Sequence, residues 1–185
     1  MNLGNKIYKY AQDLFLICRS LSGEGVRETL HYIKRLLPDL TIHNVASGTK
    51  AFDWEVPNEW NIRNASIKNA QGEKIINFKK HNLHVAGYSE PVHKNVDLAE
   101  LKQHLYTLPE QPDAIPYITS YYKKRWGFSM THRQYENLEL GDYTVYIDSN
   151  LDRGILNYGD LIIKGREERE IFLSTYICHP SMANN

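Results

Sequence analysis

A histidine near the end of the sequence, His179, has the features of a metal ligand. It follows an apolar run at residues 171–177 and Cys178, and Pro180 comes directly after it. Ligands of α/β proteins collect beyond the carboxyl ends of the sheet strands, and imidazole is the commonest metal-binding side chain. A zinc site needs about three protein ligands, so this histidine alone does not define a site.

The apolar run must position that histidine. Residues 171–177 are almost continuously apolar, which is typical of a strand buried on both faces. We therefore expect a strand that aims His179 at a cation pocket. Because successive side chains of a strand point to opposite faces, Cys178 is expected to pack away from that pocket.

The remaining elements follow from apolar spacing and turn residues. Helical spacing is found in four segments: residues 3–21, 26–37, 98–105 and 131–138. Alternation or β-branched composition predicts strands at residues 41–45, 61–68, 74–78, 83–86, 143–147 and 160–163, and makes 117–122 β-prone.

These elements predict an α/β protein with an insertion. Residues 1–53 contribute two helices and a strand, and residues 156–185 return to the same α/β domain with the strand before His179. Between them, residues 54–155 show alternation and turns instead of helical spacing, which indicates a small inserted β-rich domain.

Composition excludes several classes of partner. The chain has 185 residues, 42% hydrophobic and 24% charged, as in a globular protein. Lys plus Arg and Asp plus Glu are balanced at 22 each, so no net field favours nucleic acid or an anionic membrane. The apolar stretch at residues 14–18 is too short to span a bilayer. Two cysteines, Cys18 and Cys178, form no disulfide framework and favour a reducing cytoplasm.

A second group of candidate residues lies at positions 121–126. Tyr121, Arg125 and Trp126 offer aromatic walls and one cation, which suit a substrate carboxylate. The alternative is a strand edge with Trp126 in the core and Arg125 in solvent. His81 and His84 have a spacing that binds metal on a helix, but their strand-like surroundings put them on opposite faces.

The amino-acid sequences of several segments resemble those of one protein family. The segment "STYICHPSMANN" is similar to the start of the metal site in bacterial zinc aminopeptidase-like proteins. Members are described as polysaccharide biosynthesis proteins with an aminopeptidase-like domain, related to co-catalytic zinc aminopeptidases. The resemblance extends over essentially the whole chain, through "VASGTKAFDWEVPNEWNIRNASI", "PYITSYYKKRWGFSMTH" and "LNYGDLIIKG".

The resemblance implies a fold and a cofactor. The fold would be a zinc-peptidase-like α/β sandwich, incomplete in this chain and interrupted by the inserted domain. His179 would be the first zinc ligand, in a site of one or two ions. Asn185 occupies the position of a bridging aspartate, and a neutral amide bridges two divalent ions poorly. Ser181 stands where better-known zinc aminopeptidases carry another aspartate.

Two functions remain open at this stage. Family members are more than twice as long as this chain, so we expect the N-terminal portion of a zinc-dependent hydrolase of a peptide or amide bond. No catalytic residue is assigned in this chain, which we expect to be inactive alone. The alternative is a non-catalytic binding or scaffold protein with a degenerate metal site, linked to polysaccharide biosynthesis. The expected partner is a peptide or amide small molecule, and formation of a homo-oligomer stays open.

Overall fold

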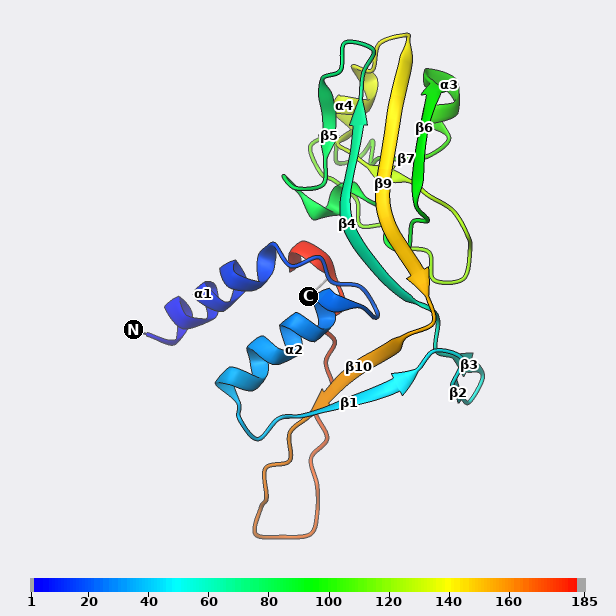
Figure 1. Ribbon diagram of the computed structural model, residues 1–185. Helices are drawn as coiled ribbons and strands as arrows, with labels where there is room; N and C mark the ends of the chain where they lie inside the picture. The colour runs from blue at the N-terminus through cyan, green and yellow to red at the C-terminus, as the bar shows by residue number, and fades with distance from the viewer. Residues whose placement is uncertain (1, 183–185) are drawn as a thin grey trace. The chain divides into compact units, whose positions relative to one another are not determined.

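The chain forms two compact units. The structure, a computed structural model, describes residues 2–182 (Figure 1). Unit 1 consists of Met1–Glu59 and Arg153–Asn185, and unit 2 of Trp60–Asp152. Unit 2 overlaps the range 54–155 in which we expect an inserted β-rich domain, and its status as an inserted domain stays a prediction.

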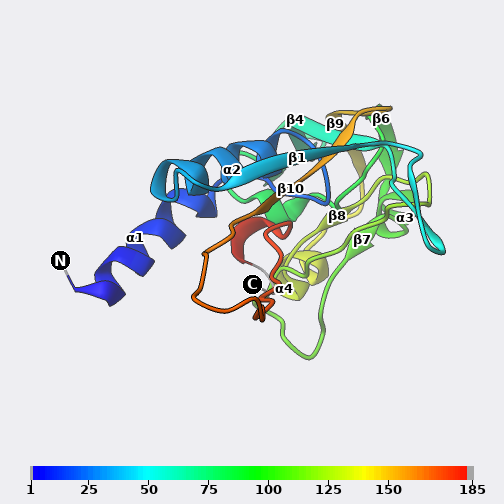
Figure 2. The ribbon, with the colours of Figure 1, turned by 90° about the horizontal axis from the view of Figure 1, so that it is seen from below.

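Unit 1 pairs two helices with a two-stranded antiparallel sheet. Its elements are α1 (Leu3–Phe15), α2 (Glu24–Leu36), β1 (Thr41–Ala46), β2 (Lys50–Ala51), β3 (Trp54–Glu55), β10 (Ile155–Asp160) and the 3₁₀ turn η2 (Pro180–Met182). Strands β1 and β10 pair from Thr41↔Asp160 to Ala46↔Ile155. The two helices lie side by side in Figures 1 and 2. Between them, the Tyr10 and Tyr32 rings meet edge to face with their centroids 6.3 Å apart.

The first helix is shorter than its apolar spacing predicts. Asn2 caps its start, because the side-chain oxygen accepts the Asn5 amide at 2.9 Å. The helix ends at Phe15 instead of residue 21. After that end, the Arg19 guanidinium donates through Nη1 to the Leu14 carbonyl at 2.6 Å. A side chain thus satisfies a carbonyl that a longer helix would have paired with its own backbone.

A glycine allows the second helix to start close to this turn. A Cβ atom on Gly25 would lie 2.1 Å from the Cys18 carbonyl oxygen, so no other residue fits there. The helix then buries Val26, Thr29 and Leu30. Leu30 and Leu40 approach Gly159 of β10 at 3.3 Å from where its Cβ would stand, so α2 covers one face of the sheet.

Unit 2 is built around a four-stranded sheet of order β5-β4-β9-β6. Its elements are β4 (Glu59–Lys68), β5 (Lys74–Asn77), η1 (Asn82–His84), β6 (Val92–Asp97), α3 (Leu98–Lys102), β7 (Leu105–Tyr106), β8 (Phe128–Ser129), α4 (His132–Glu136) and β9 (Asp142–Asp152). The first residue of β4, Glu59, is the last of unit 1's leading segment.

The core of unit 2 follows strand alternation. On β9, residues Tyr143, Val145 and Ile147 are buried, whereas the residues between them are half-exposed. Phe128 from β8 and Leu101 from α3 are fully buried in this unit as well. This single-sided burial is the usual pattern of an antiparallel sheet with one face in solvent.

Several segments differ from the sequence-based expectations. Residues 82–84 form a 3₁₀ turn, not part of a strand, and residues 117–122 contribute only an isolated bridge, Gly87↔Thr119. Strand β10 ends at Asp160, where we expected a strand to begin. Residues 171–177 form no strand, and residues 171–176 are exposed, whereas a strand buried on both faces needs neighbours on each side. None of the helices in residues 2–182 is long and apolar enough to cross a membrane.

Candidate functional site

The backbone of His179 is anchored by a buried arginine. Arg19, only 2% exposed, donates from Nε to the His179 carbonyl at 2.9 Å and from Nη1 to the Leu14 carbonyl at 2.6 Å. Two segments that are distant in sequence, the end of α1 and the Cys178–Pro180 turn, are therefore tied together by one planar guanidinium. This role was not predictable from the sequence, in which Arg19 is only a charge that interrupts an apolar stretch.

The His179 ring lies among side chains of its own segment. Its centroid is 5.0 Å from that of Tyr176, with the rings edge to face at 77°. Its Nδ1 is 4.0 Å from the Cys178 sulfur. With no strand at residues 171–177, the expected opposite orientation of Cys178 and His179 does not apply.

The two cysteine thiols are protonated in the metal-free chain. Burial raises the pKa of Cys18 to about 12, and burial also raises the pKa of Cys178. Both cysteines are free. A raised pKa keeps both thiols protonated at neutral pH while no metal ion coordinates them.

The described residues do not fit a zinc site by themselves. Within residues 2–182, no group of three or more His, Cys, Asp or Glu side chains is placed to hold a metal ion. His179 is a single candidate ligand, and Asn185, the second position expected from the sequence, lies outside the described residues. A zinc ion at His179 would therefore need ligands from other polypeptide.

The three candidate substrate residues lie in unit 2, packed against its own side chains. The Arg125 Nη2 donates to the Thr119 carbonyl at 3.0 Å, and its guanidinium lies 5.5 Å from the centre of the Tyr106 ring. Trp126 stacks on His104 at 3.6 Å. Tyr121 meets Tyr88 edge to face at 5.1 Å.

These contacts separate the three side chains into different environments. Arg125 is half-buried, and its Nε has no hydrogen-bond partner in the described structure. Trp126 is half-buried, and the Lys94 Nζ atom lies 5.2 Å from the centre of its ring. Neither the core position expected for Trp126 nor the solvated one expected for Arg125 holds fully, and their role in substrate binding stays a prediction.

His81 and His84 are closer together than strand geometry allows. The 3₁₀ turn η1 brings their rings to 5.8 Å at 69°. His84 Nδ1 contacts the Ser129 carbonyl at 2.8 Å, and His81 Nδ1 accepts the Leu83 amide at 3.2 Å. Burial lowers the pKa of both histidines. The expectation of opposite faces is wrong, because it assumed a strand where the chain turns.

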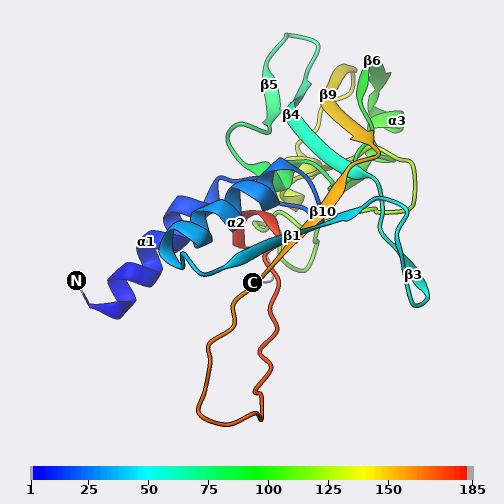
Figure 3. The ribbon, with the colours of Figure 1, turned by 60° about the horizontal axis from the view of Figure 1, so that its bottom comes forward.

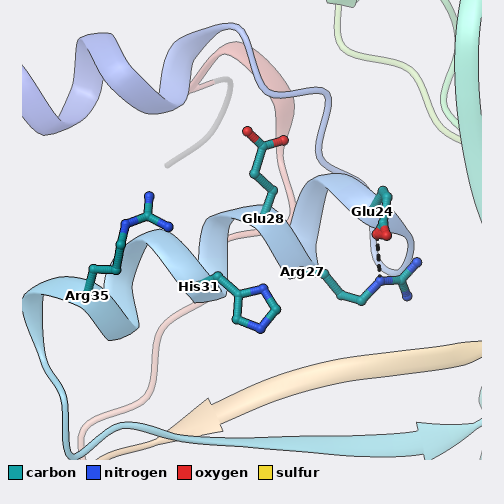
Figure 4. A pocket seen from close by; sticks show the side chains of 5 residues that line it. All are labelled: Glu24, Arg27, Glu28, His31 and Arg35. Carbon is teal, nitrogen blue, oxygen red and sulfur yellow. Dashed lines mark hydrogen bonds and ion pairs between the residues drawn. The ribbon is translucent and has the colours of Figure 1, made fainter.

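A hollow of about 430 Å³ lies along α2 in unit 1. It is lined by Glu24, Arg27, Glu28, His31 and Arg35 (Figure 4). In Figure 4 these side chains leave the helix in different directions, and they do not converge on a common point.

The key cation of that hollow is already neutralised. Arg27 bonds to Glu24 at 2.8 Å and to Glu59 at 2.6 Å, and the hydrogen bond to Glu59 is the main cause of its raised pKa. The spacing of the lining residues at three and four positions is that of a charged, solvated helix face. The hollow therefore offers no catalytic arrangement.

The comparison with known protein families concerns the middle of the chain. Residues 59–150 match a family described as a domain of unknown function (DUF2172). The match covers nearly all of unit 2. The chain is thus a mixed α/β protein of small sheets whose residues 59–150 are similar to this family.

The particular relatives come from Clostridium acetobutylicum. One carries the provisional name of a polysaccharide biosynthesis protein with an aminopeptidase-like domain; it is 54% identical over 182 residues, which are 98% of this chain. A crystal structure from the same organism, provisionally described as a peptidase, superposes with a TM-score of 0.94 at 54% identity. That structure is matched over 98% of this chain.

The relatives are longer than the region that matches. This chain spans 42% of the relative's sequence and 43% of the chain in the crystal structure. The likeness therefore concerns less than half of each relative.

Proposed function

We propose that this chain is part of a peptidase-like hydrolase and supplies His179 as one ligand of a zinc ion. The observation that supports this most is the 54% identity, over 98% of the chain, to a protein named for an aminopeptidase-like domain. The crystal structure described as a peptidase supports the same class. The bond cleaved would be a peptide or amide bond, in a process linked to polysaccharide biosynthesis.

The geometry gives His179 a defined place. A ligand histidine must be held in position before the metal arrives, and the surroundings of such ligands fix that position. Arg19 fixes the backbone of His179 at 2.9 Å, and the Tyr176 ring packs against its imidazole at 5.0 Å. Arg19 is therefore a positioning residue, because it acts on the candidate ligand and not on a substrate.

The remaining ligands must come from outside the described residues. One histidine cannot hold zinc with useful affinity, since catalytic sites use three protein ligands. Among the contacts of residues 2–182, none favours the scaffold alternative.

The test uses a single polypeptide in which this chain replaces the matching 42% of the C. acetobutylicum relative. Zinc content by plasma mass spectrometry and hydrolysis of a panel of aminoacyl p-nitroanilides are measured together. We expect bound zinc and hydrolysis, with both lost in His179→Ala and retained in the control His93→Ala, an exposed histidine of unit 2. A folded chimera without zinc or hydrolysis would contradict the proposal.

A further inference from the structure

The connection that follows β10 exposes an unusual apolar surface. Figures 1 and 3 show it as a long loop that runs away from β10 and returns towards α1. We call residues 161–177 the apolar loop. Its large apolar side chains are mostly in solvent: Ile162 78%, Ile163 84%, Ile171 91%, Phe172 89%, Leu173 89% and Tyr176 54% exposed.

Such exposure is unexpected for a folded chain. Single exposed apolar residues are normal, but a contiguous apolar patch marks a binding surface. Three consecutive residues, Ile171, Phe172 and Leu173, are each about nine-tenths exposed. The same residues have strong strand propensity, yet residues 161–179 form no strand in the described structure.

The sheet of unit 1 also needs more partners. β1 and β10 form a sheet of two strands only, and an isolated two-stranded sheet is marginally stable in water. Apolar residues of α1 are exposed in the same unit, among them Leu3 at 73% and Ile7 at 57%. Unit 1 therefore has strand-forming sequence, open sheet edges and uncovered apolar side chains.

The relatives contain further polypeptide that can cover these apolar side chains and pair with the open sheet edges. They match this chain over 98% of its length at 54% identity, but over only 42% of their own. The region that matches this chain therefore occurs in proteins that carry a further region of more than equal length.

We infer that the apolar loop is a docking surface for a polypeptide equivalent to the unmatched region of these relatives. On docking, residues 171–177 become a β-strand, whose backbone amides pair with the partner and whose apolar side chains leave water. The charged turn at residues 164–170 stays in solvent, since its Lys, Arg and Glu side chains would lose hydration if buried.

The docking does not depend on zinc. The apolar side chains and backbone amides of residues 171–177 supply the interaction, whereas the proposed metal ligand follows at His179. A His179→Ala variant is therefore expected to dock unchanged. Docking without zinc or hydrolysis would defeat only the proposed function, and zinc binding without docking of this loop would defeat only the present inference.

The test mixes this chain with a separately produced polypeptide made from the unmatched region of the C. acetobutylicum relative. Light scattering after size exclusion measures the complex, and hydrogen exchange with mass spectrometry measures the amides of residues 171–177. We expect a 1:1 complex and exchange slowed by about 100-fold, because free loops open at almost no cost. If that polypeptide is insoluble, the chimera described above is compared with the isolated chain.

Two matched substitutions identify the surface. Phe172→Asp places a charge in the apolar loop, and Leu140→Asp places one at a residue of unit 2 that is 93% exposed. Neither side chain is buried in the chain alone. We expect Phe172→Asp to weaken docking by about 10-fold or more, the equivalent of roughly 1.4 kcal/mol, and Leu140→Asp to leave it unchanged.

Three results would overturn the inference. The first is unchanged exchange at residues 171–177 with the partner in excess and also in the chimera. The second is equal effects of the two substitutions. The third is a dimer of this chain alone with those amides already protected, which would assign the apolar loop to a second copy.

Discussion

Unit 2 buries its apolar side chains, whereas unit 1 leaves many of its own in water. In unit 2, Tyr88, Phe128 and Met130 are each 0% exposed and join a core that spans the sheet and the short helices. In unit 1, the buried apolar set is small, and buried polar residues such as Arg19 and Thr29 stand beside it. The two parts of one chain thus use different sources of stability.

The two units reach a defined structure in different ways. Unit 2 depends on area removed from water, which contributes roughly 25 cal/mol per Å². Unit 1 depends on specific polar anchors: Arg19 on two carbonyls, and Arg27 on Glu59, which in turn accepts the Ile155 amide at 3.0 Å. Anchors of this kind define positions, but they supply less net stability than a filled core.

The largest effect should come from the core of unit 2. Phe128→Ala removes a ring that is 0% exposed, and such truncations cost about 3–5 kcal/mol. Urea unfolding, followed by hydrogen exchange in peptides of unit 2, measures the loss. Leu140→Ala, at a 93% exposed position, is the control and should change stability by less than about 0.5 kcal/mol. Similar losses of stability in both variants would show that burial of Phe128 does not stabilise unit 2, and the contrast with unit 1 would fail.

A smaller effect is expected from the main anchor of unit 1. Arg19→Met keeps much of the side-chain volume but removes the guanidinium donor from the His179 and Leu14 carbonyls, of which Leu14 keeps the Ile17 amide at 3.2 Å. The expected cost is about 1–3 kcal/mol. Faster hydrogen exchange in residues 176–182 would report the released segment.

The exposed Arg35→Met on α2 is the matched control for the anchor. If both substitutions leave exchange in that segment unchanged, Arg19 does not order His179, and its positioning role fails.

Acid should weaken unit 2 through His84. Burial lowers the pKa of this imidazole, so the unfolded chain, with a pKa near about 6.5, binds the proton more tightly. Stability from this group is therefore complete above the unfolded pKa and is lost as the pH falls through it, by at most about 1.4 kcal/mol per pH unit.

The measurement is unfolding of the chain between pH 7.5 and pH 5, both chosen to bracket about 6.5. His84→Gln should flatten the profile, and the exposed His93→Gln should leave it as in the parent. A parent profile without any decline on acidification would show that His84 is not protected from protonation.

The smallest effect concerns a local cap in unit 2. Thr131 and Gln134 form a reciprocal capping box at the start of α4, and Thr131→Ala should cost about 1 kcal/mol. Thr131→Ser, which keeps the hydroxyl, should recover most of it in thermal unfolding. A loss as large as that of Phe128→Ala would mean that α4, not the apolar core, holds unit 2 together.

Local patterns made much of unit 2 predictable from the sequence. The Asn-Ala-Gln-Gly turn joins β4 and β5 as expected, with Gly72 at φ +83°, because the required residue types lie within the turn itself. Asp97 caps α3 through the Glu100 amide at 2.8 Å, as its position indicated. In unit 1, the helix predicted at residues 26–37 and the strand predicted at 41–45 are observed at nearly those bounds.

Features that depend on distant residues were not predictable. The burial of Arg19 follows from a carbonyl that lies 160 positions away. The proximity of His81 and His84 follows from a single turn of 3₁₀ helix, which short sequences do not distinguish from a strand. The strand expected at residues 171–177 needs neighbours on both faces, and residues 171–176 are exposed in the described structure.

The junction between the leading and trailing segments of unit 1 has a consequence for how such chains arise. Unit 1 holds its own two breakpoints together: Ile155 donates to Glu59, and Ser47 donates to the Gly154 carbonyl at 2.9 Å. The strands that begin and end unit 2, β4 and β9, are sheet neighbours. A single recombination event at this seam can therefore add, remove or exchange a whole module with adjacent ends. Protein engineers can use the same two breakpoints to insert a reporter domain.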